Sequence, residues 1–310
     1  MAKINNELEY INDMALNNAG ELIEKSEERY RNIIEDIARR VCEDKGREIV
    51  MLAGPSSSGK TTTAKKLSEE FTKNGVRTYV LSLDDFYFNR EDIPLLPDGT
   101  RDFETVYALD LDCFEKTVNS LLKGETVKSP VFDFTTGKRS DTQFNEITLG
   151  EEDAVIIEGL HALNPIITEK IKGKLLKIYI SVSSRIYDSK GKIVLNKRNL
   201  RFVRRMVRDY RFRGSTVDNT YRLWKNVMAG EDKYLFPYRD NADIRINTIH
   251  LYEPCVFKET ATRLLLESEI SEEYRQDAAR LCRALNSFED IDVNRVPQGS
   301  LLREFLGSKE

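Results

Sequence analysis

Residues 49–61 read Ile-Val-Met-Leu-Ala-Gly-Pro-Ser-Ser-Ser-Gly-Lys-Thr, and this stretch decides the fold. A short apolar run leads into a loop of the pattern Gly-x-x-x-x-Gly-Lys-Ser/Thr, and a helical pattern follows over 60–73. The glycines of such a loop permit a tight turn whose main-chain N–H groups face phosphate oxygens, and the helix start adds its positive dipole end. Lys60 reaches the outer phosphates and the Thr61 hydroxyl binds Mg²⁺. The alternative, a Ser- and Gly-rich turn that binds nothing, is disfavoured by the strand before the loop and the helix after it.

Beyond this loop, short apolar runs alternate with helical patterns, which predicts a parallel sheet with helices on both faces. The expected strands are 49–53, 77–83, 154–158, 176–182 and 243–246. The expected helices are 60–73, 109–122, 165–171, 197–210 and 217–229. A turn signal at Ser189-Lys190-Gly191 predicts a small surface hairpin within 184–196. The fold class is therefore a P-loop NTPase-type, doubly wound α/β sheet.

Helical segments are expected at both ends of the chain. Residues 1–46 form a polar helical segment with a break at Asn17-Asn18-Ala19-Gly20. Residues 47–258 form the P-loop domain, and 259–310 form a helical segment whose amphipathic stretch from Tyr274 to Phe288 docks on the core.

Composition excludes several classes of protein. The 310 residues carry 48 Lys or Arg against 52 Asp or Glu, which does not suggest a nucleic-acid-binding protein. The apolar runs are too short for a membrane span, and the N-terminus lacks the apolar stretch of a signal peptide. Four scattered cysteines without a Cys-x-x-Cys pair, and only two histidines, argue against disulfides and a His-rich metal site. The expected location is the cytoplasm. Asn196-Lys197-Arg198-Asn199 lacks the aspartate of a guanine-reading Asn-Lys-x-Asp motif, which counts against a switch GTPase.

Acidic residues end two of the predicted strands. Asp84-Asp85 follows 80–83, and Glu158 follows 155–157. Ligands of doubly wound sheets bind beyond the carboxyl ends of the strands, so both acids are expected to face the phosphate loop. One acid can accept the proton of an attacking hydroxyl while another supports Mg²⁺. Helix capping or plain solvation is the alternative for Asp84 and Glu158, and Asp85 is ambiguous because neighbours on a strand point to opposite sides.

A basic stripe occupies 197–213, which holds eight Lys or Arg and one acid. On a helix, Arg201, Arg204, Arg205 and Arg208 share one face, and Leu200, Val203, Val207 and Tyr210 share the other. The pattern favours an arginine-rich lid over nucleotide phosphates, with Gly214 as a mobile end. A solvated basic face and a nucleic-acid patch are the alternatives.

Together these segments resemble the uridine kinase / phosphoribulokinase family of P-loop kinases. The resemblance rests on GPSSSGKT (54–61), LDDFYF (83–88), RDFETVYALD (101–110), PVFDFTTGKR (130–139), VIIEGLHAL (155–163), RRMVRDYRFRG (204–214) and FPYRDNADIRIN (236–247). It covers about residues 48–250. It implies an ATP- and Mg²⁺-dependent phosphorylation of a ribose 5′-hydroxyl.

The resemblance also implies roles for individual residues. Asp84 would be the general base, and Lys60, Arg208 and Arg213 would act on the transferring phosphoryl group. The implied nucleotide-binding residues are Gly54, Ser57, Ser58, Gly59, Lys60, Thr61 and Thr62, and the implied metal-side residues are Thr61, Glu158 and Asp84. The implied acceptor-binding residues are Asp84, Tyr87, Glu104, Phe132, Arg139 and Arg205.

The sequence departs from the family where a pyrimidine base would be recognised. Phe132 and Gly137 stand where uridine-cytidine kinases carry a Tyr and a His, and Ser215 replaces the last lid arginine. The sugar-binding residues are kept while the base-reading side chains are lost, so the acceptor is a nucleoside or a similar sugar alcohol. A sugar phosphate as acceptor, and an ATP-binding regulator without catalysis, are the alternatives. No residue decides whether the protein forms a homo-oligomer.

Overall fold

The core of the protein is a five-stranded parallel sheet. The computed structural model describes residues 5–43, 49–93, 95, 101–133 and 136–307. The strand order is β2-β5-β1-β6-β9. The strands are β1 (Ile49–Ala53), β2 (Thr78–Ser82), β5 (Ala154–Glu158), β6 (Leu175–Ser181) and β9 (Ile244–Asn247). All five strands predicted from the sequence are thereby confirmed, with ends that differ by at most one residue.

Strand β1 is central to the sheet and buried on both sides. Val50 and Leu52 belong to one hydrophobic cluster, and Met51 and Ala53 belong to another on the opposite face. A strand with two buried faces needs an uninterrupted apolar run, which is what 49–53 supplies. The order of connections reverses beside β1, and the loop after β1 therefore opens at a place where doubly wound sheets bind ligands.

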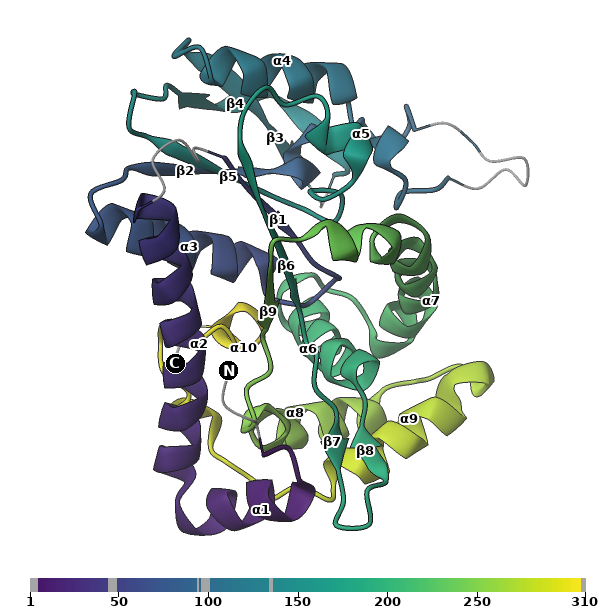
Figure 1. The fold of residues 1–310 in the computed structure, drawn as a ribbon. Helices are drawn as coiled ribbons and strands as arrows, with labels where there is room; N and C mark the ends of the chain where they lie inside the picture. The colour runs from purple at the N-terminus through teal and green to yellow at the C-terminus, as the bar shows by residue number, and fades with distance from the viewer. Residues whose placement is uncertain (1–4, 44–48, 94, 96–100, 134–135, 308–310) are drawn as a thin grey trace.

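Helices cover both faces of the sheet, as the alternating pattern predicts (Figure 1). The first face carries α3 (Lys60–Lys73), which coincides with its predicted range, and behind it the long α2 (Ala19–Glu43). The second face carries α4 (Leu111–Leu121) and α5 (Pro165–Thr168). The remaining helices are α1 (Leu8–Asn17), α6 (Lys197–Phe212), α7 (Val217–Tyr234), α8 (Glu253–Glu267), α9 (Glu272–Leu285) and α10 (Arg303–Leu306).

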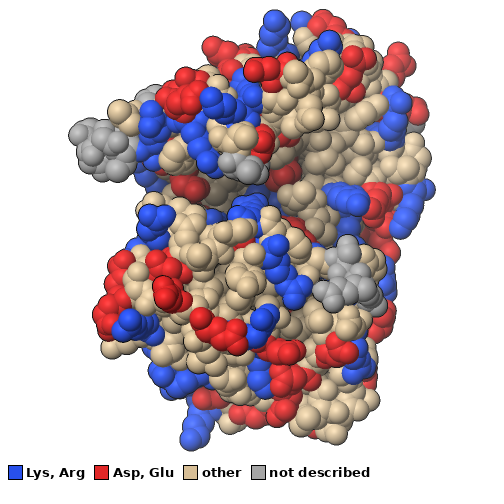
Figure 2. Space-filling model, turned by 180° about the vertical axis from the view of Figure 1, so that it is seen from behind, with Lys and Arg blue, Asp and Glu red and all other residues tan. Residues whose placement is uncertain are grey.

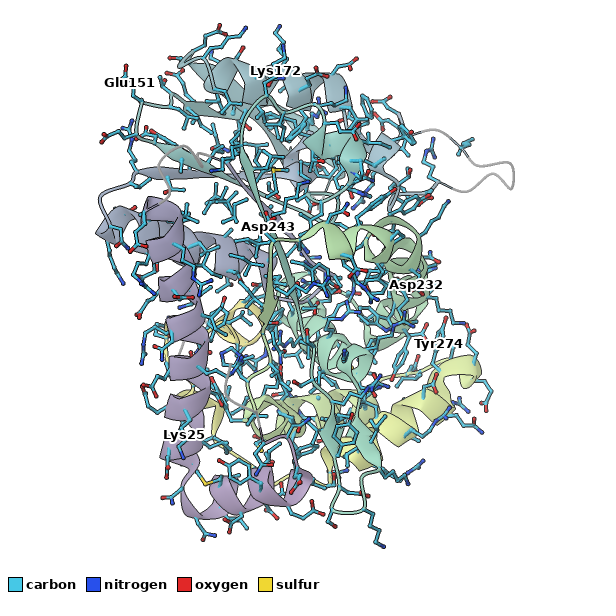
Figure 3. The ribbon with its side chains drawn as sticks, in the orientation of Figure 1. Lys25, Glu151, Lys172, Asp232, Asp243 and Tyr274 are labelled. Atoms are coloured by element: carbon cyan, nitrogen blue, oxygen red, sulfur yellow. The ribbon has the colours of Figure 1, made fainter. Side chains whose placement is uncertain are left out.

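The N- and C-terminal helices share the hydrophobic cluster on the α3 face. The Tyr30 hydroxyl of α2 bonds to Thr63 Oγ1 of α3 at 2.7 Å. Tyr274 of α9, labelled in Figure 3, stacks on Tyr221 of α7 with ring centroids 5.3 Å apart. The expected break between the first two helices falls at Asn18. The expected boundary at 46/47 lies outside the described residues. The one at 258/259 falls inside α8, so we propose that the kinase domain extends to Glu267.

Two antiparallel hairpins project from this framework. The hairpin expected within 184–196 is present as β7 (Ile186–Tyr187) and β8 (Ile193–Leu195). A second one, β3 (Val127–Asp133) with β4 (Lys138–Ile147), was not predicted, because β4 is mostly exposed and polar and lacks an alternating apolar pattern. Within the described residues, no helix combines the length and apolar character that crossing a membrane requires.

Candidate active site

The loop between β1 and α3 has the shape of a phosphate-binding nest. Ser57 and Gly59 both have left-handed backbones, with φ of 59° and 89°. A Cβ on Gly54 would lie 2.5 Å from the main-chain oxygen of Ile180, so a side chain there would displace the sheet. The hydroxyls of Ser57 and Ser58 are buried and have no hydrogen-bond partner among the described residues. Left-handed turns next to a helix start, with unused hydroxyl donors, fit the predicted binding of nucleotide phosphates.

Helix α6 holds this loop from behind. The Arg201 guanidinium donates to Ser56 O at 3.0 Å, and that of Arg204 donates to Ser57 O at 3.4 Å. Each arginine is buried beside a buried glutamate. Arg201 binds Glu231 of α7 through two contacts of 2.6 and 2.8 Å, and Arg204 binds Glu253 of α8 at 2.5 Å. Because the Ser56 carbonyl turns toward α6, the Ser57 N–H of the same peptide points to the opposite side, where an anion would bind. The next N–H, that of Ser58, donates to Pro55 O at 3.2 Å and so closes the loop on itself.

This arrangement corrects the expected arginine stripe in two respects. Arg201 and Arg204 do not project over a ligand, since their side chains are 3% and 0% exposed and serve to brace the loop. Tyr210, placed on the packed face, is instead 48% exposed. The sequence pattern could not separate bracing from ligand-facing arginines because the glutamates that bury them lie on α7 and α8, far along the chain.

The remaining arginines of α6 gather around one buried carboxylate. Asp209 is 3% exposed and pairs with Arg205 at 3.1 Å, Arg208 at 2.7 Å and Arg213 at 3.7 Å. Arg205 also donates to Ser56 Oγ at 2.8 Å, and half of the Arg213 side chain is open to solvent. Three guanidinium groups sharing one carboxylate keep a surplus of positive charge beside the phosphate loop. Asp209 is thus a positioning residue that sequence inspection missed.

An acidic cluster lies at the start of α3, next to the loop. Glu158, at the end of β5, accepts from Thr61 Oγ1 at 3.3 Å and from Ser82 Oγ at 3.1 Å. Ser82 Oγ in turn accepts from the main-chain N–H of Asp84 at 3.3 Å, at the start of the 3₁₀ helix Leu83–Phe86. The ends of β2 and β5 therefore bring Thr61, Glu158 and Asp84 into one linked group, as the strand-end positions predict.

The electrostatics of the cluster tie it to Lys60. Burial raises the pKa of Glu158 to about 7 despite the nearby Lys60 ammonium, and the negative charge of Asp84 adds to the rise. Burial likewise raises the pKa of Asp84, which Lys60 and Arg213 partly oppose. A carboxylate with a raised pKa, between two cations, is suited to accept a proton from a hydroxyl.

A second acid-rich group, formed by Asp102 and Glu104, lies against α7. Burial raises the pKa of Glu104 to about 7, opposed by Arg205. Asp102 accepts from the main-chain N–H of Glu104 at 3.0 Å and from the Tyr234 hydroxyl at 2.5 Å. A Cβ on Gly230 of α7 would lie 2.5 Å from that of Glu104, so glycine makes room for this side chain.

The aromatic side chains expected near the acceptor lie together. The rings of Tyr87 and Phe132 are 5.9 Å apart, centroid to centroid. Burial, followed by the charges of Asp84, Glu104 and Asp102, raises the pKa of the Tyr87 phenol. Tyr87 is thus within electrostatic reach of all three acids.

Arg139 has a different position from the one expected. Its guanidinium donates to Tyr87 O at 2.9 Å, Phe86 O at 2.7 Å and Asp110 at 3.0 Å. These contacts use all three of its nitrogens, so we propose that Arg139 positions the Asp84–Tyr87 segment and does not bind the acceptor. Asp85 is similarly structural here, since its carboxylate accepts from the N–H of Phe132 at 3.1 Å.

The space-filling view shows a hollow across this face of the molecule, with acidic and basic side chains on its walls (Figure 2). Among the described residues, no three His, Cys, Asp or Glu side chains form a preformed metal cage. Mg²⁺ keeps several waters and binds through few carboxylates together with substrate phosphates. Thr61, Glu158 and Asp84 as the metal-side residues therefore stay a prediction.

The fold and this site define a P-loop kinase. The model of the "Phosphoribulokinase / Uridine kinase family" matches residues 49–252. The chain belongs to this family and is a phosphotransferase with an alcohol acceptor.

Individual relatives are distant. The chain is 26% identical to uridine kinases of Halalkalibacterium halodurans and of Anoxybacillus flavithermus, each over 64% of this chain and 84% of the relative. Among solved structures, it resembles a proposed fructose transport system kinase from Silicibacter sp. TM1040, with a TM-score of 0.50 and 20% identity over 69% of this chain and 98% of the other. The last likeness concerns the fold alone.

The buried ion pair between Arg204 and Glu253 leads to a prediction about stability. Arg204→Met should lower the free energy of unfolding by about 3–5 kcal/mol, because it leaves the Glu253 carboxylate buried without the guanidinium that neutralises it. The double variant Arg204→Met/Glu253→Gln should recover part of that loss, since no lone charge remains buried. Urea unfolding measures both, and Arg275→Ala, at an exposed pair, serves as the control with a loss below about 1 kcal/mol. A loss for Arg204→Met no larger than the control would contradict the bracing role.

The raised pKa of Glu158 predicts a pH dependence. Its folded pKa of about 7 lies above the ordinary value of 4.5, so the native protein binds more protons than the unfolded chain between these values. The unfolding free energy of the ligand-free protein should therefore fall as pH rises from 4.5 to 7. Glu158→Gln should flatten this fall in urea titrations across the interval, and an unchanged slope would rule out Glu158 as its source.

Proposed function

We propose that the protein transfers the γ-phosphoryl group of ATP to a hydroxyl of a nucleoside, the 5′-hydroxyl of its ribose, or of a similar uncharged sugar alcohol. The observation that carries this proposal is the position of Asp84. Its main-chain N–H donates to Ser82 Oγ, which binds Glu158, and its carboxylate lies within electrostatic reach of Lys60, Glu158 and Tyr87. A pure nucleotide-binding regulator has no need of such acceptor-side groups.

Each group of site residues has its own role in the proposed phosphoryl transfer. The loop amides, Ser57, Ser58 and Lys60 bind the phosphates of ATP, and Arg205, Arg208 and Arg213 surround the transferring group with positive charge. Asp84 orients the acceptor hydroxyl and accepts its proton as the bond to phosphorus forms. Thr61 and Glu158 would hold Mg²⁺, which would supply positive charge to the phosphates of ATP. Glu104 binds ribose hydroxyls.

The charge of the acceptor side favours an uncharged acceptor. Asp84, Asp102 and Glu104 all raise the pKa of Tyr87, which means that three carboxylates converge there. A phosphorylated sugar would bring a like charge toward them, whereas the hydroxyls of a ribose donate hydrogen bonds to carboxylates. The names of the uridine kinase relatives agree with this class, while the Phe132 and Gly137 positions leave the base open. The cytoplasm stays the predicted location.

A variant pair tests the mechanism. Lys60→Ala should abolish turnover, and Asp84→Ala should lower kcat by roughly 10²–10⁴ while ATP still binds, because only the proton acceptor is lost. ADP release measures turnover, and equilibrium binding measures the nucleotide. Asp141→Asn, on the exposed strand β4, is the control and should behave as the parent protein. Full activity in the Asp84 variant would remove that residue from the mechanism.

An acceptor panel tests the substrate class. Uridine, cytidine, ribose and ribulose 5-phosphate should be compared with mass detection of the product, using Lys60→Ala as the blank. We expect an uncharged acceptor to exceed ribulose 5-phosphate by at least ~10-fold in kcat/KM, because like charges disfavour the latter. Preference for ribulose 5-phosphate would support the sugar-phosphate alternative, and ATP binding without any product would support the regulator.

A further inference from the structure

The C-terminal segment Pro297–Gly307 packs directly on the phosphate loop. Leu301 is fully buried, and a Cβ on Gly59 would lie 2.5 Å from its Cδ1. The guanidinium of Arg204 lies over the ring of Phe305, 5.3 Å from its centroid. The last turn, α10, sits between α2 and α6 near the centre of the molecule (Figure 1).

The segment is fixed by polar contacts at both ends. Arg303 donates to Val296 O at 2.6 Å, and Arg211 of α6 donates to Leu306 O at 2.7 Å. The Ser300 hydroxyl lies 3.1 Å from the Tyr252 hydroxyl. The side chain between these anchors, Glu304, is therefore held at a defined place.

Glu304 occupies donors that belong to the first turn of α3. Its Oε2 atom accepts from Thr62 Oγ1 at 2.6 Å and lies 3.4 Å from the main-chain N of Thr62. The N–H groups of a first helical turn have no partner within the helix, and in a phosphate loop they bind phosphate oxygens. Thr62 is among the residues expected to bind ATP, so a carboxylate and a phosphate compete for the same two donors.

Glu304 and a phosphate of ATP both carry negative charge, and both would accept from the hydroxyl and main-chain N–H of Thr62. Two anions at one set of donors exclude each other, because neither the charge nor the hydrogen bonds can be shared.

We propose that the C-terminal segment is a built-in brake on nucleotide binding. In the ligand-free protein Glu304 holds the Thr62 donors, and binding of ATP requires this carboxylate to leave them. The apparent affinity for ATP then equals the intrinsic affinity multiplied by the fraction of molecules in which Glu304 has already left the Thr62 donors. The proposal rests on the proposed function only in taking ATP as the ligand of the loop.

The test compares ATP binding by the full-length protein and two variants. Glu304→Ala frees the Thr62 donors, and Glu304→Gln removes the charge while it keeps a hydrogen-bond acceptor. Equilibrium binding of Mg·ATP, by calorimetry, should show an affinity about 5- to 50-fold higher for Glu304→Ala, with Glu304→Gln between it and the parent. Glu267→Gln, at the exposed end of α8, makes the same change of charge and should bind as the parent does.

The outcomes separate this proposal from the kinase function. Unchanged or weaker ATP binding in both Glu304 variants would overturn the brake, and so would the absence of ATP binding in all the proteins. Tighter binding in the variants would support the brake even if no acceptor in the panel is phosphorylated, in which case the proposed function fails alone. Should Glu304→Ala unfold, the Glu304→Gln protein decides the matter, with tighter binding supporting the brake and unchanged binding overturning it.

Discussion

The site depends on two buried arginines that hold the phosphate loop by its carbonyl oxygens. Arg201 and Arg204 contact Ser56 O and Ser57 O, and each is balanced by a buried glutamate from another helix. A buried ion pair adds little net stability, but breaking it is costly. The pairs therefore make the position of α6 relative to the loop hard to change. The loop conformation, and with it the direction of its amides, depends on this contact.

The same helix presents its other arginines to the substrate side. Arg205, Arg208 and Arg213 share the carboxylate of Asp209 and lie beside the loop, whereas the acids at the ends of β2 and β5 lie at the start of α3. The phosphates of ATP carry several negative charges and need positive groups around them. The acceptor hydroxyl must lose a proton and needs a carboxylate beside it. The sheet and α6 together supply both, because β2 and β5 end beside each other and α6 contacts the loop that follows β1. The C-terminal segment adds a third component, a carboxylate placed at the donors of α3.

Sequence patterns predicted the strands, helices and site residues whose positions depend on neighbouring residues in the chain. The strand 49–53 was predictable because both of its faces are buried, and the helix 60–73 because the loop motif fixes where it begins. Asp84 and Glu158 were predictable as a pair, since each lies at the end of an apolar strand. The two hydrogen bonds of Ser82 that link them were not predictable from the sequence. The β3–β4 hairpin was not predicted, because its second strand is mostly exposed and polar. The roles of Arg139, Arg204 and Glu304 depend on partners more than 40 residues away, in contacts that no spacing in the sequence encodes.

The most direct test of the account is a crystal structure with Mg²⁺, a non-hydrolysable ATP analogue and uridine. The account predicts the triphosphate in the loop 54–61, and the acceptor hydroxyl about 2.6–3.2 Å from the carboxylate of Asp84, within hydrogen-bonding distance. A triphosphate bound elsewhere, or an acceptor hydroxyl directed away from Asp84 toward another base, would contradict it.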